Sequence, residues 1–544
     1  MMLSSGFVGS MTRESFWIDA ISVNQKDLTE RGSQVSLMVR IYSECALCTV
    51  WLGEDTDTTE KAFAILNLFA SGKHFHEWPI YVTEQAPGSG APGELEMFES
   101  KEGLLEPLRD VFDMPWWTRT WTVQEIILPR VAIVKCGRHE ITWDNIMEGN
   151  KYAFTHLTQC CKDFSKHFGY QDENSVAAFL TAIADLRPSW EQYHDTVRTM
   201  DMIDILASHR FRQTSDLRDK VYGVLSFCPP SLQQTCLADY DASLPDCYSW
   251  PVIHDFQHSK SLRALAHTQL EGNDVSLPSW TPDWSRASDQ VEQQRERFKF
   301  YNSYGACGTA ALSYSRVGHA LSLRGIHQET ITHVGKVIGW FDETAIETIR
   351  TWHHLWQSVC GDHERLGISN DQAPPDIFMR TLLRGIFDPQ KDTVSKGKRN
   401  RSYYRASEAD IAACQRWWSL AQATQNTHKP HLWIEDKVEA ARIQHVHDSL
   451  LQKLQFSRFF ITDKQSIGLG PPWSMKVGDE VWIACGGKQP LILRRDDSLS
   501  QPDGQITAPR VYHKLVGADC YVDGIMHGEA AANLERDAMD VHII

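Results

Sequence analysis

The stretch from Trp117 to Leu128 is the most informative candidate site, because it places a carboxylate beside two indoles and a guanidinium. Trp117, Trp121 and Glu125 are spaced by four residues, so one helix over this stretch would place them on the same face. Arg119 lies in the same stretch. A carboxylate on such a face can stabilise a developing positive charge, and indole rings can stack on bases.

A structural role is the alternative for each of these residues. Glu125 can pair with Arg119 or with Arg130, and Trp121 can be a core residue. Asp19 is the next acid that could reach the same cleft, but a buried acid more often accepts hydrogen bonds from loop amides than reacts. The sequence alone leaves both interpretations open.

The polar residues that could form another wall of this cleft are predicted to lie near a strand. Phe16 to Ile21 is a short, mostly apolar run that contains Asp19, which predicts a strand buried on both faces. Asn24 and Gln25 follow in a polar loop. Because sites in open parallel sheets collect at the carboxyl ends of strands, we expect these side chains to face the cleft.

A helix and further strands are predicted after this loop. Asp27 and Glu30 have the spacing of a capping box, which indicates a helix start. The apolar run at Cys48–Leu52 predicts a second strand. The run of β-branched residues at Val131–Cys136 predicts a further parallel strand. Strand, helix and strand would form a right-handed parallel βαβ unit. The buried stripe of the helix is predicted at Val35, Met38, Tyr42 and Cys45.

The composition is that of a soluble globular protein. The chain has 544 residues, of which 42% are hydrophobic and 23% charged. At roughly 100–200 residues per domain, this length suggests three or four domains. The net charge of −16 argues against nucleic-acid binding through the whole surface. No apolar run approaches the roughly 18 residues of a membrane helix, and we expect no membrane segment and a cytoplasmic location.

Neither the cysteines nor the histidines predict a metal site. The thirteen cysteines show no disulfide framework, and reduced thiols are the simpler interpretation. Cys45 and Cys48 have a Cys-x-x-Cys spacing, but no second pair follows at ligand spacing. His74 and His76 lack the i, i+4 spacing of a helical zinc site. We therefore expect no bound metal, and we interpret these histidines as surface or capping residues.

Several separate blocks resemble the fungal heterokaryon incompatibility (HET) domain, in the order of that family. They are WIDAISVNQ, then ER with QV, then IY and VWLG, all within Phe16–Gly53. A later block, WWTRTWTVQEIILPRVAIVKCGRHEITW at Trp116–Trp143, resembles the arginine–tryptophan–glutamine–glutamate segment of the family. The residues before Phe16 do not resemble the family's Ser-Tyr-x-Trp-Gly block. We therefore expect the sheet to lack its usual first strand, which would leave an unpaired edge and poor solubility.

The Trp-x-x-x-Glu spacing of Trp121 and Glu125 resembles the TIR domain, to which the HET domain is thought to be distantly related. In enzymatic TIR domains the matching glutamate is the catalytic residue of NAD cleavage. The resemblance thus implies that Glu125 is catalytic and that NAD is a substrate, with no cofactor required. The predicted NAD-binding residues are Trp121, Trp117, Arg119, Asp19, Asn24 and Gln25.

The resemblance also implies an α/β fold with a TIR-like, flavodoxin-like parallel sheet. Four regions are expected along the chain. They are a partial HET domain at 1–148, a helical region at 149–300, a mixed α/β accessory region at 301–457 and a small β-rich module at 458–544. The short strands of the last region, separated by Gly, Asp and Pro, suggest a small antiparallel barrel.

The function that the resemblance implies is non-self recognition in a fungus, leading to programmed cell death. Its molecular act would be TIR-like self-association with NAD hydrolysis. Two alternatives remain, a non-catalytic death-signalling adaptor and an inactive truncated relative. The expected partners are proteins, either incompatibility factors or NLR-like proteins.

Overall fold

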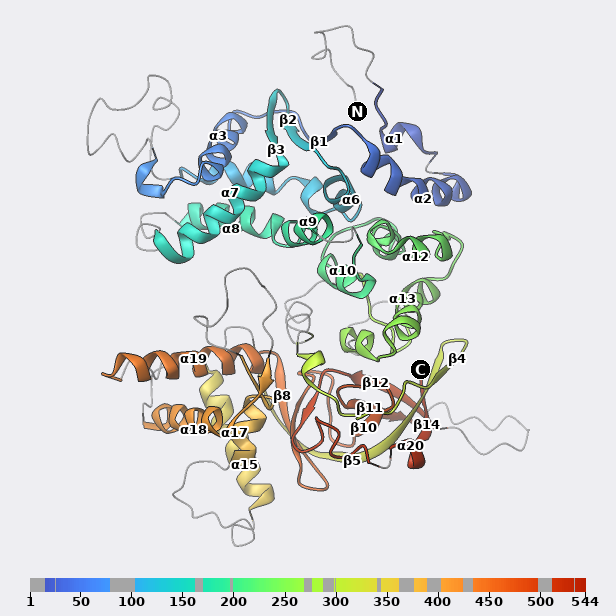
Figure 1. Ribbon diagram of the computed structural model, residues 1–544, viewed down its shortest axis with the longest axis vertical. Helices are drawn as coiled ribbons and strands as arrows, with labels where there is room; N and C mark the ends of the chain where they lie inside the picture. The colour runs from blue at the N-terminus through green and yellow to red at the C-terminus, as the bar shows by residue number, and fades with distance from the viewer. Residues whose placement is uncertain are drawn as a thin grey trace. The chain divides into compact units, whose positions relative to one another are not determined.

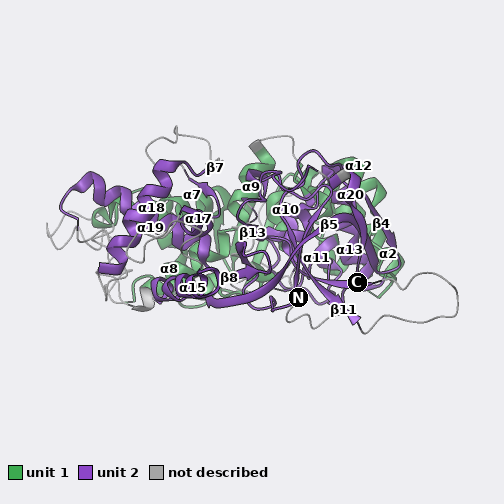
Figure 2. Cartoon of the chain, turned by 90° about the horizontal axis from the view of Figure 1, so that it is seen from below, with its two compact units in different colours: residues 1–201, 222–242 green, residues 202–221, 243–544 purple. Residues whose placement is uncertain are grey.

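The computed structural model divides the chain into two compact units, coloured separately in Figure 2. Unit 1 comprises 1–201 and 222–242, and unit 2 comprises 202–221 and 243–544. Among the described residues, every helix is too short or too polar to cross a membrane. The residues that the structure describes are 15–24, 26–78, 103–161, 170–195, 199–268, 276–286, 298, 300–339, 344–361, 376–388, 403–423, 434–497, 511–532 and 534–544.

Unit 1 combines helices with a small sheet, and is drawn in blue to green in Figure 1. Its strands are β1 (Cys48–Gly53), β2 (Ala132–Cys136) and β3 (His139–Thr142). Its α-helices are α1 (Asp19–Ser22), α2 (Leu28–Glu44), α3 (Thr59–Ala70), α5 (Glu106–Phe112), α6 (Thr122–Ile127), α7 (Trp143–Thr155), α8 (Tyr170–Ile183), α9 (Leu186–Asp195) and α12 (Pro230–Thr235). Its shorter turns are η1 (Phe75–Glu77), η2 (Pro115–Thr118), η3 (His156–Cys160) and η5 (Leu225–Phe227).

The predicted strand over Phe16–Ile21 is wrong, because the segment enters the one-turn helix α1. Phe16 and Ile21 are 65% and 76% exposed, whereas a strand covered on both faces would bury them. The amide of Val23 donates to the carbonyl of Asp19 at 3.1 Å. Among the described residues no strand pairs with this segment, so its backbone forms local hydrogen bonds instead. The predicted βαβ unit is therefore absent at Phe16–Gly53.

The predicted start of α2 is confirmed. One carboxylate oxygen of Asp27 accepts from the amides of Thr29 and Glu30, each at 3.0 Å. The Glu30 carboxylate reaches back further than a capping box requires, because it accepts from the amide of Asn24 at 3.1 Å. Glu30 thereby closes the loop before the helix as well as its first turn.

The sheet of unit 1 has the order β1-β2-β3. β1 and β2 are parallel and β3 is antiparallel to β2, which confirms the parallel strands predicted at Cys48–Leu52 and Val131–Cys136. Gly137 turns the chain from β2 to β3 with a φ of +53°, and a Cβ there would lie 2.4 Å from the side chain of Asp55. A three-stranded sheet confirms the α/β class, while its TIR-like, flavodoxin-like character stays a prediction.

The predicted helix over Trp117–Leu128 is wrong in its first half. Trp117 lies in the 3₁₀ turn η2, and Arg119 is extended, with φ −79° and ψ 144°. The α-helix α6 begins only at Thr122, whose hydroxyl donates to the Arg119 carbonyl at 2.7 Å. This hydrogen bond stabilises the bend between η2 and α6, so residues spaced by four across it do not share a face.

Unit 2 contains a second group of helices and most of the strands (Figure 1). Its helices are α10 (Met202–Ser208), α13 (Leu244–Ser259), α15 (Ala345–Cys360), α17 (Asp376–Leu382), α18 (Glu408–Ala423), α19 (Lys437–Leu454) and α20 (Leu534–Asp537), with α11 (Asp219–Tyr222) at the boundary of the units in the sequence. Its strands are β4 (Tyr314–Val317), β5 (Ala320–Ile338), β6 (Ile386–Phe387), β7 (Tyr404–Arg405), β8 (Ser457–Thr462), β9 (Ile467–Gly470), β10 (Glu480–Ala484), β11 (Leu491–Asp496), β12 (Tyr512–Gly517), β13 (Tyr521–Val522) and β14 (Met539–Ile543).

The long strand β5 closes part of the nine-stranded sheet into a ring. The strand order runs β10-β11-β12-β14-β5, and β5 also pairs with β10. The other half of β5 pairs with β8, which continues to β9 and β13. The expected barrel thus exists, but it includes β5 from outside the last region, and its β12–β14 pair is parallel. Closure leaves the five strands of the ring fewer unpaired edges.

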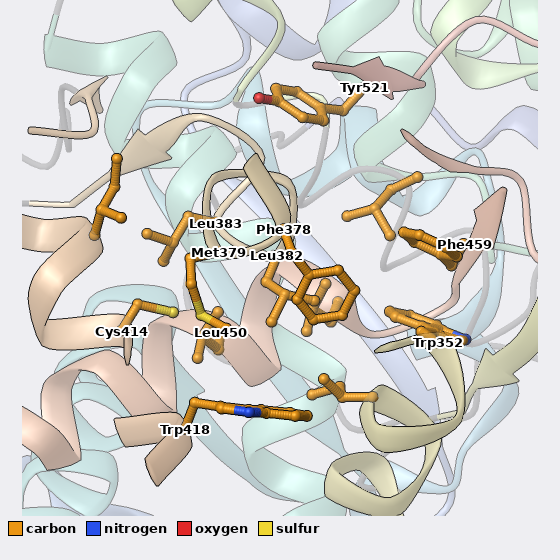
Figure 3. Packing of buried hydrophobic residues seen from close by; sticks show 14 of the residues in the cluster. Trp352, Phe378, Met379, Leu382, Leu383, Cys414, Trp418, Leu450, Phe459 and Tyr521 are labelled. Carbon is orange, nitrogen blue, oxygen red and sulfur yellow. The ribbon is translucent and has the colours of Figure 1, made fainter. Parts of the chain in front are cut away.

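Aromatic side chains form the core beside β8, where α15, α17, α18 and α19 gather (Figure 3). Phe378 of α17 is fully buried. Its ring centroid lies 6.1 Å from that of Trp418 and 5.9 Å from that of Phe459. Rings at these separations contribute both buried area and favourable edge-to-face contacts.

A buried cation ties these helices to the sheet of unit 2. The side chain of Arg384 is fully buried, and it donates to the carbonyls of Lys453 at 3.0 Å and Asp519 at 3.2 Å. It also donates to the hydroxyl of Ser457 at 2.8 Å. Because a buried charge needs such partners, this position fixes the end of α19 against β8 and the segment before β13.

Removal of the central ring of this core should destabilise unit 2. We expect Phe378→Ala to lower the free energy of unfolding by about 3–5 kcal/mol, because it leaves a cavity where a buried ring was. Urea denaturation of the full chain measures the loss. Val438→Ala is the control, since Val438 is 80% exposed, and its midpoint should match that of the parent. Equal midpoints for the two variants would contradict the packing described here.

Candidate functional site

The carboxylate of Glu125 is held in place from outside its own helix. Glu125 lies in the first turn of α6, and its side chain is only partly exposed. The indole Nε1 of Trp116 donates to its Oε2 at 2.8 Å. Trp116 is itself buried, in the η2 turn. The hydrogen bond fixes the orientation of the carboxylate and leaves the other oxygen available.

Burial raises the pKa of Glu125 above its ordinary value. The largest cause is the loss of solvation, and the charge of Asp19 adds to it. The hydrogen bond from Trp116 and the positive charge of Arg119 oppose the rise and lower the pKa. The charges of Asp19 and Arg119 therefore act on the pKa of Glu125, and the shared cleft stays a prediction.

The charge of Glu125 acts on two further groups, one on α2 and one on β1. Burial raises the pKa of Tyr42, and the charge of Glu125 raises it further. Burial and Glu125 have the same effect on the pKa of the Cys48 thiol. The ring of Trp17 meets that of Tyr42 edge to face, with centroids 5.8 Å apart. The phenol and thiol therefore both stay protonated beside the acid, as neutral polar groups.

We call these residues the Glu125 cluster. It is assembled from the segment before α1, from α2 and β1, and from the η2–α6 bend, and α6 contacts α2, β1 and α9 directly. Its members are Trp17, Asp19, Tyr42, Cys48, Trp116, Arg119 and Glu125.

Trp117 is a core residue. Its side chain is 2% exposed, its Nε1 donates to the Val111 carbonyl at 2.8 Å, and its ring lies 4.7 Å from that of Phe112. Trp121 is half-buried and stands at the N-cap position of α6. The indole that contacts Glu125 is thus Trp116, which the spacing by four missed because it assumed one continuous helix.

The other predicted site residues have local structural positions. Asn24 is exposed, and its side-chain oxygen accepts from the amide of Lys26 at 3.2 Å in the loop before α2. Arg119 is exposed. Gln25 lies outside the described residues. Roles of these residues in binding NAD stay predictions.

Tyr42 and Cys48 are the functional candidates that the sequence interpretation missed. Tyr42 was assigned to the buried stripe of α2, where its hydroxyl had no assigned role. A polar atom on an otherwise apolar stripe was the signal that could have identified it, because a buried hydroxyl needs a polar neighbour. Nothing in the spacing of Cys48 distinguishes it from a strand core residue.

Four residues in another part of unit 1 have ligand atoms suited to a metal. The nitrogen and sulfur atoms of His74, His156, Cys160 and Cys161 all lie within 4.8 Å of one another. The sequence did not indicate this group, because His74 and Cys161 are 87 positions apart.

Replacement of the buried acid should stabilise the protein in a pH-dependent manner. The raised pKa of Glu125 means that the folded state holds the proton more tightly than the unfolded state. The contribution of this proton to the stability of the folded state is complete below the ordinary glutamate pKa of 4.5. It is lost as the pH rises through the raised pKa that Glu125 has in the folded state. We expect Glu125→Gln, which cannot ionise, to melt above the parent at about pH 8 and to approach it at about pH 4.

Thermal melts across that range measure the difference. Glu60→Gln is the control, because Glu60 is exposed on α3 in the same unit, and its melting temperature should follow that of the parent at every pH. A Glu125→Gln variant that melts below the parent throughout would show that ionisation of Glu125 carries no penalty.

Comparison with known proteins agrees with the sequence blocks. Residues 8–125 match the family model of the heterokaryon incompatibility protein (HET). The chain is also similar to heterokaryon incompatibility protein 6, OR allele, of Neurospora crassa. The two are 22% identical over 604 aligned positions, which cover 96% of this chain and 82% of that protein. No solved structure matches the chain significantly. The matched segment ends at Glu125, so it includes every member of the Glu125 cluster, and the chain is similar to HET proteins over this segment.

Proposed function

We propose that this protein acts in heterokaryon incompatibility, where it recognises non-self and promotes programmed cell death. The HET domain and the similarity to the Neurospora protein over most of the chain support this function. The family match contains the Glu125 cluster, so the same segment supplies both the assignment and the candidate chemistry. The expected setting is the cytoplasm of a fungal cell, with incompatibility factors or NLR-like proteins as partners.

The molecular act that we propose is NAD hydrolysis at Glu125. This proposal rests on the half-buried carboxylate of Glu125, whose Oε2 accepts a hydrogen bond from Trp116 Nε1 at 2.8 Å. In this reaction water adds to the ribose carbon as its bond to nicotinamide breaks, giving ADP-ribose, nicotinamide and one proton. Positive charge moves from the nicotinamide ring onto the ribose in the transition state. A carboxylate beside the ribose stabilises that charge.

The environment of Glu125 favours this role over a permanent ion pair. Burial makes the ionised form costly in the free protein, as the raised pKa shows. A cationic ribose in the transition state offsets this cost. The carboxylate therefore stabilises the transition state more than it stabilises the ground state. The aromatic faces of Trp17, Tyr42 and Trp121 supply stacking surfaces, and the exposed Arg119 supplies positive charge for the diphosphate.

A non-catalytic adaptor is the second candidate, and exposed apolar side chains favour it. Phe16, before α1, and Ile21, within it, are 65% and 76% exposed. Leu37 in α2 and Leu47 after it are 44% and 47% exposed. Among the described residues, β1 pairs with a neighbouring strand on one edge only. Such features suit self-association or recruitment of a partner.

NAD turnover by the purified full-length chain tests the enzyme. We expect Glu125→Gln to lower the rate of NAD consumption by roughly 10²–10⁴-fold. Trp116→Phe keeps the ring but removes the N–H donor, and should cost roughly 10–100-fold, since hydrogen bonds to charged groups contribute about 1.5–3 kcal/mol. Glu60→Gln should retain the parental rate. Absence of NAD turnover in the parent would refute the enzymatic proposal.

Cell killing separates the two candidates. Expression of the parent in a fungal host should kill, and Glu125→Gln should not if NAD hydrolysis is the cause. Killing by Glu125→Gln at the parental level would instead support the adaptor. In that case Leu37→Glu combined with Leu47→Glu should abolish both killing and self-association, which sedimentation of the purified variant measures.

A further inference from the structure

His74, His156, Cys160 and Cys161 converge at the end of α7, and none of them belongs to the Glu125 cluster. His156 and Cys161 are 5% and 3% exposed. His74 is half-buried and Cys160 is exposed. Two imidazoles and two thiols at one point form a donor set that binds soft or borderline divalent metal ions.

A π-helical turn brings three of the four residues together. η3 is a π-helix over His156–Cys160, and the amide of Cys161 donates to the carbonyl of His156 at 2.9 Å. This i→i+5 hydrogen bond places Cys160 and Cys161 on either side of the face that His156 occupies. A regular α-helix would have rotated Cys161 further from that face. π-turns are rare and are frequent at functional sites.

His74 reaches the same point from the segment that follows α3. Its backbone amide donates to the Glu77 carboxylate at 2.8 Å, which fixes the start of η1. The next residue, Phe75, is fully buried against Phe69 and Trp78 and anchors this turn. Rings also hold His156 in place, since its centroid lies 5.4 Å from that of Phe75. Both imidazoles are therefore positioned by well-packed neighbours.

The distances between the donor atoms match the edges of a tetrahedron. Zinc bonds of about 2.3 Å to sulfur and 2.0–2.1 Å to nitrogen imply ligand–ligand distances of about 3.3–3.8 Å. His74 Nδ1 lies 3.3 Å from Cys161 Sγ, and His156 Nδ1 lies 3.8 Å from Cys161 Sγ and 2.9 Å from Cys160 Sγ. Of these three distances, the last must lengthen, and Cys160 is exposed. All the ligand atoms lie within 4.8 Å of one another.

We propose that His74, His156, Cys160 and Cys161 bind one zinc ion. Four protein ligands complete a tetrahedral shell, which makes this a structural site with no open position for substrate. The ion would link the turn after α3 to the end of α7 across 87 positions of chain. This inference is independent of NAD hydrolysis, because no member of the Glu125 cluster takes part.

Two metal-free arrangements would account for the same convergence. The thiols could only donate hydrogen bonds to the imidazoles, or the adjacent cysteines could form a disulfide. Hydrogen bonds from the thiols would also turn Nδ1 of both imidazoles toward the sulfur atoms, so the orientation of the rings does not separate these arrangements from the zinc site. The two alternatives differ from the zinc site in metal content and in the number of free thiols.

Cobalt titration of the purified, chelator-treated full chain tests the proposal. We expect one equivalent of Co²⁺ to bind with the intense visible bands of a tetrahedral ion and with a sulfur-to-cobalt charge-transfer band. Zn²⁺ should abolish both signals, and it should raise the melting temperature of the chelated protein. Absence of these bands, or a disulfide between Cys160 and Cys161 in the protein as isolated under reducing conditions, would overturn the proposal.

Variants assign the signal to these residues. Cys160→Ser alters an exposed side chain, so the variant should fold. It should bind Co²⁺ at least about 10–100-fold more weakly than the parent. Loss of a residue that only hydrogen-bonds to a ligand already weakens metal binding by roughly that factor. His74→Gln should behave alike. Cys236→Ser and His354→Gln, outside the cluster, should bind as the parent does. Unchanged binding and bands in Cys160→Ser and His74→Gln would likewise refute the site.

Discussion

Unit 1 depends on two consecutive polar side chains in α6, Gln124, which is buried, and Glu125, which is half-buried. Gln124 is 1% exposed, and its amide donates to the carbonyl of Gly223 at 2.9 Å. The Glu125 carboxylate accepts a hydrogen bond from the indole Nε1 of Trp116. A buried polar group without a partner costs about 1–3 kcal/mol, so these two bonds fix the rotation of α6 about its axis. The charge of Glu125 raises the pKa values of Tyr42 and Cys48, and the charge of Asp19 raises the pKa of Glu125.

The 222–242 segment completes unit 1 although it is distant in sequence. Besides the bond to Gly223, its Tyr240 ring lies 3.9 Å from the guanidinium of Arg31. The carbonyl of Ala238 lies 2.5 Å from the position of a Cβ on Gly32, so only glycine lets α2 approach it this closely. Both α2 and α6 thus rest on this segment, and the HET-matched residues 8–125 do not form the unit alone.

Local patterns predicted the elements whose hydrogen bonds are local or whose apolar runs are long. The Asp27 cap, β1 and β2 belong to this class. Prediction failed at Phe16–Ile21 and at Trp117–Thr122 for one physical reason. A strand requires a neighbouring strand, and a helix requires an uninterrupted backbone ladder, and neither requirement is visible in residue types. Thr122 bonds to the carbonyls before it and ends the continuity that the spacing by four assumed.

The sequence by itself determined the resemblance to the HET domain, which the family match over residues 8–125 bears out, because that resemblance depends on ordered blocks of residue types. The roles of Glu125, Asp19 and Arg119 stay predictions. The tertiary structure alone decided that Trp116 donates a hydrogen bond to the acid, whereas Trp117 is a core residue. It also decided that the charge of Glu125 raises the pKa values of Tyr42 and Cys48. It alone brought His74 to the two cysteines. These contacts depend on which way a bend or a π-turn directs side chains that are far apart in sequence, and hydrophobic periodicity has no information about such directions.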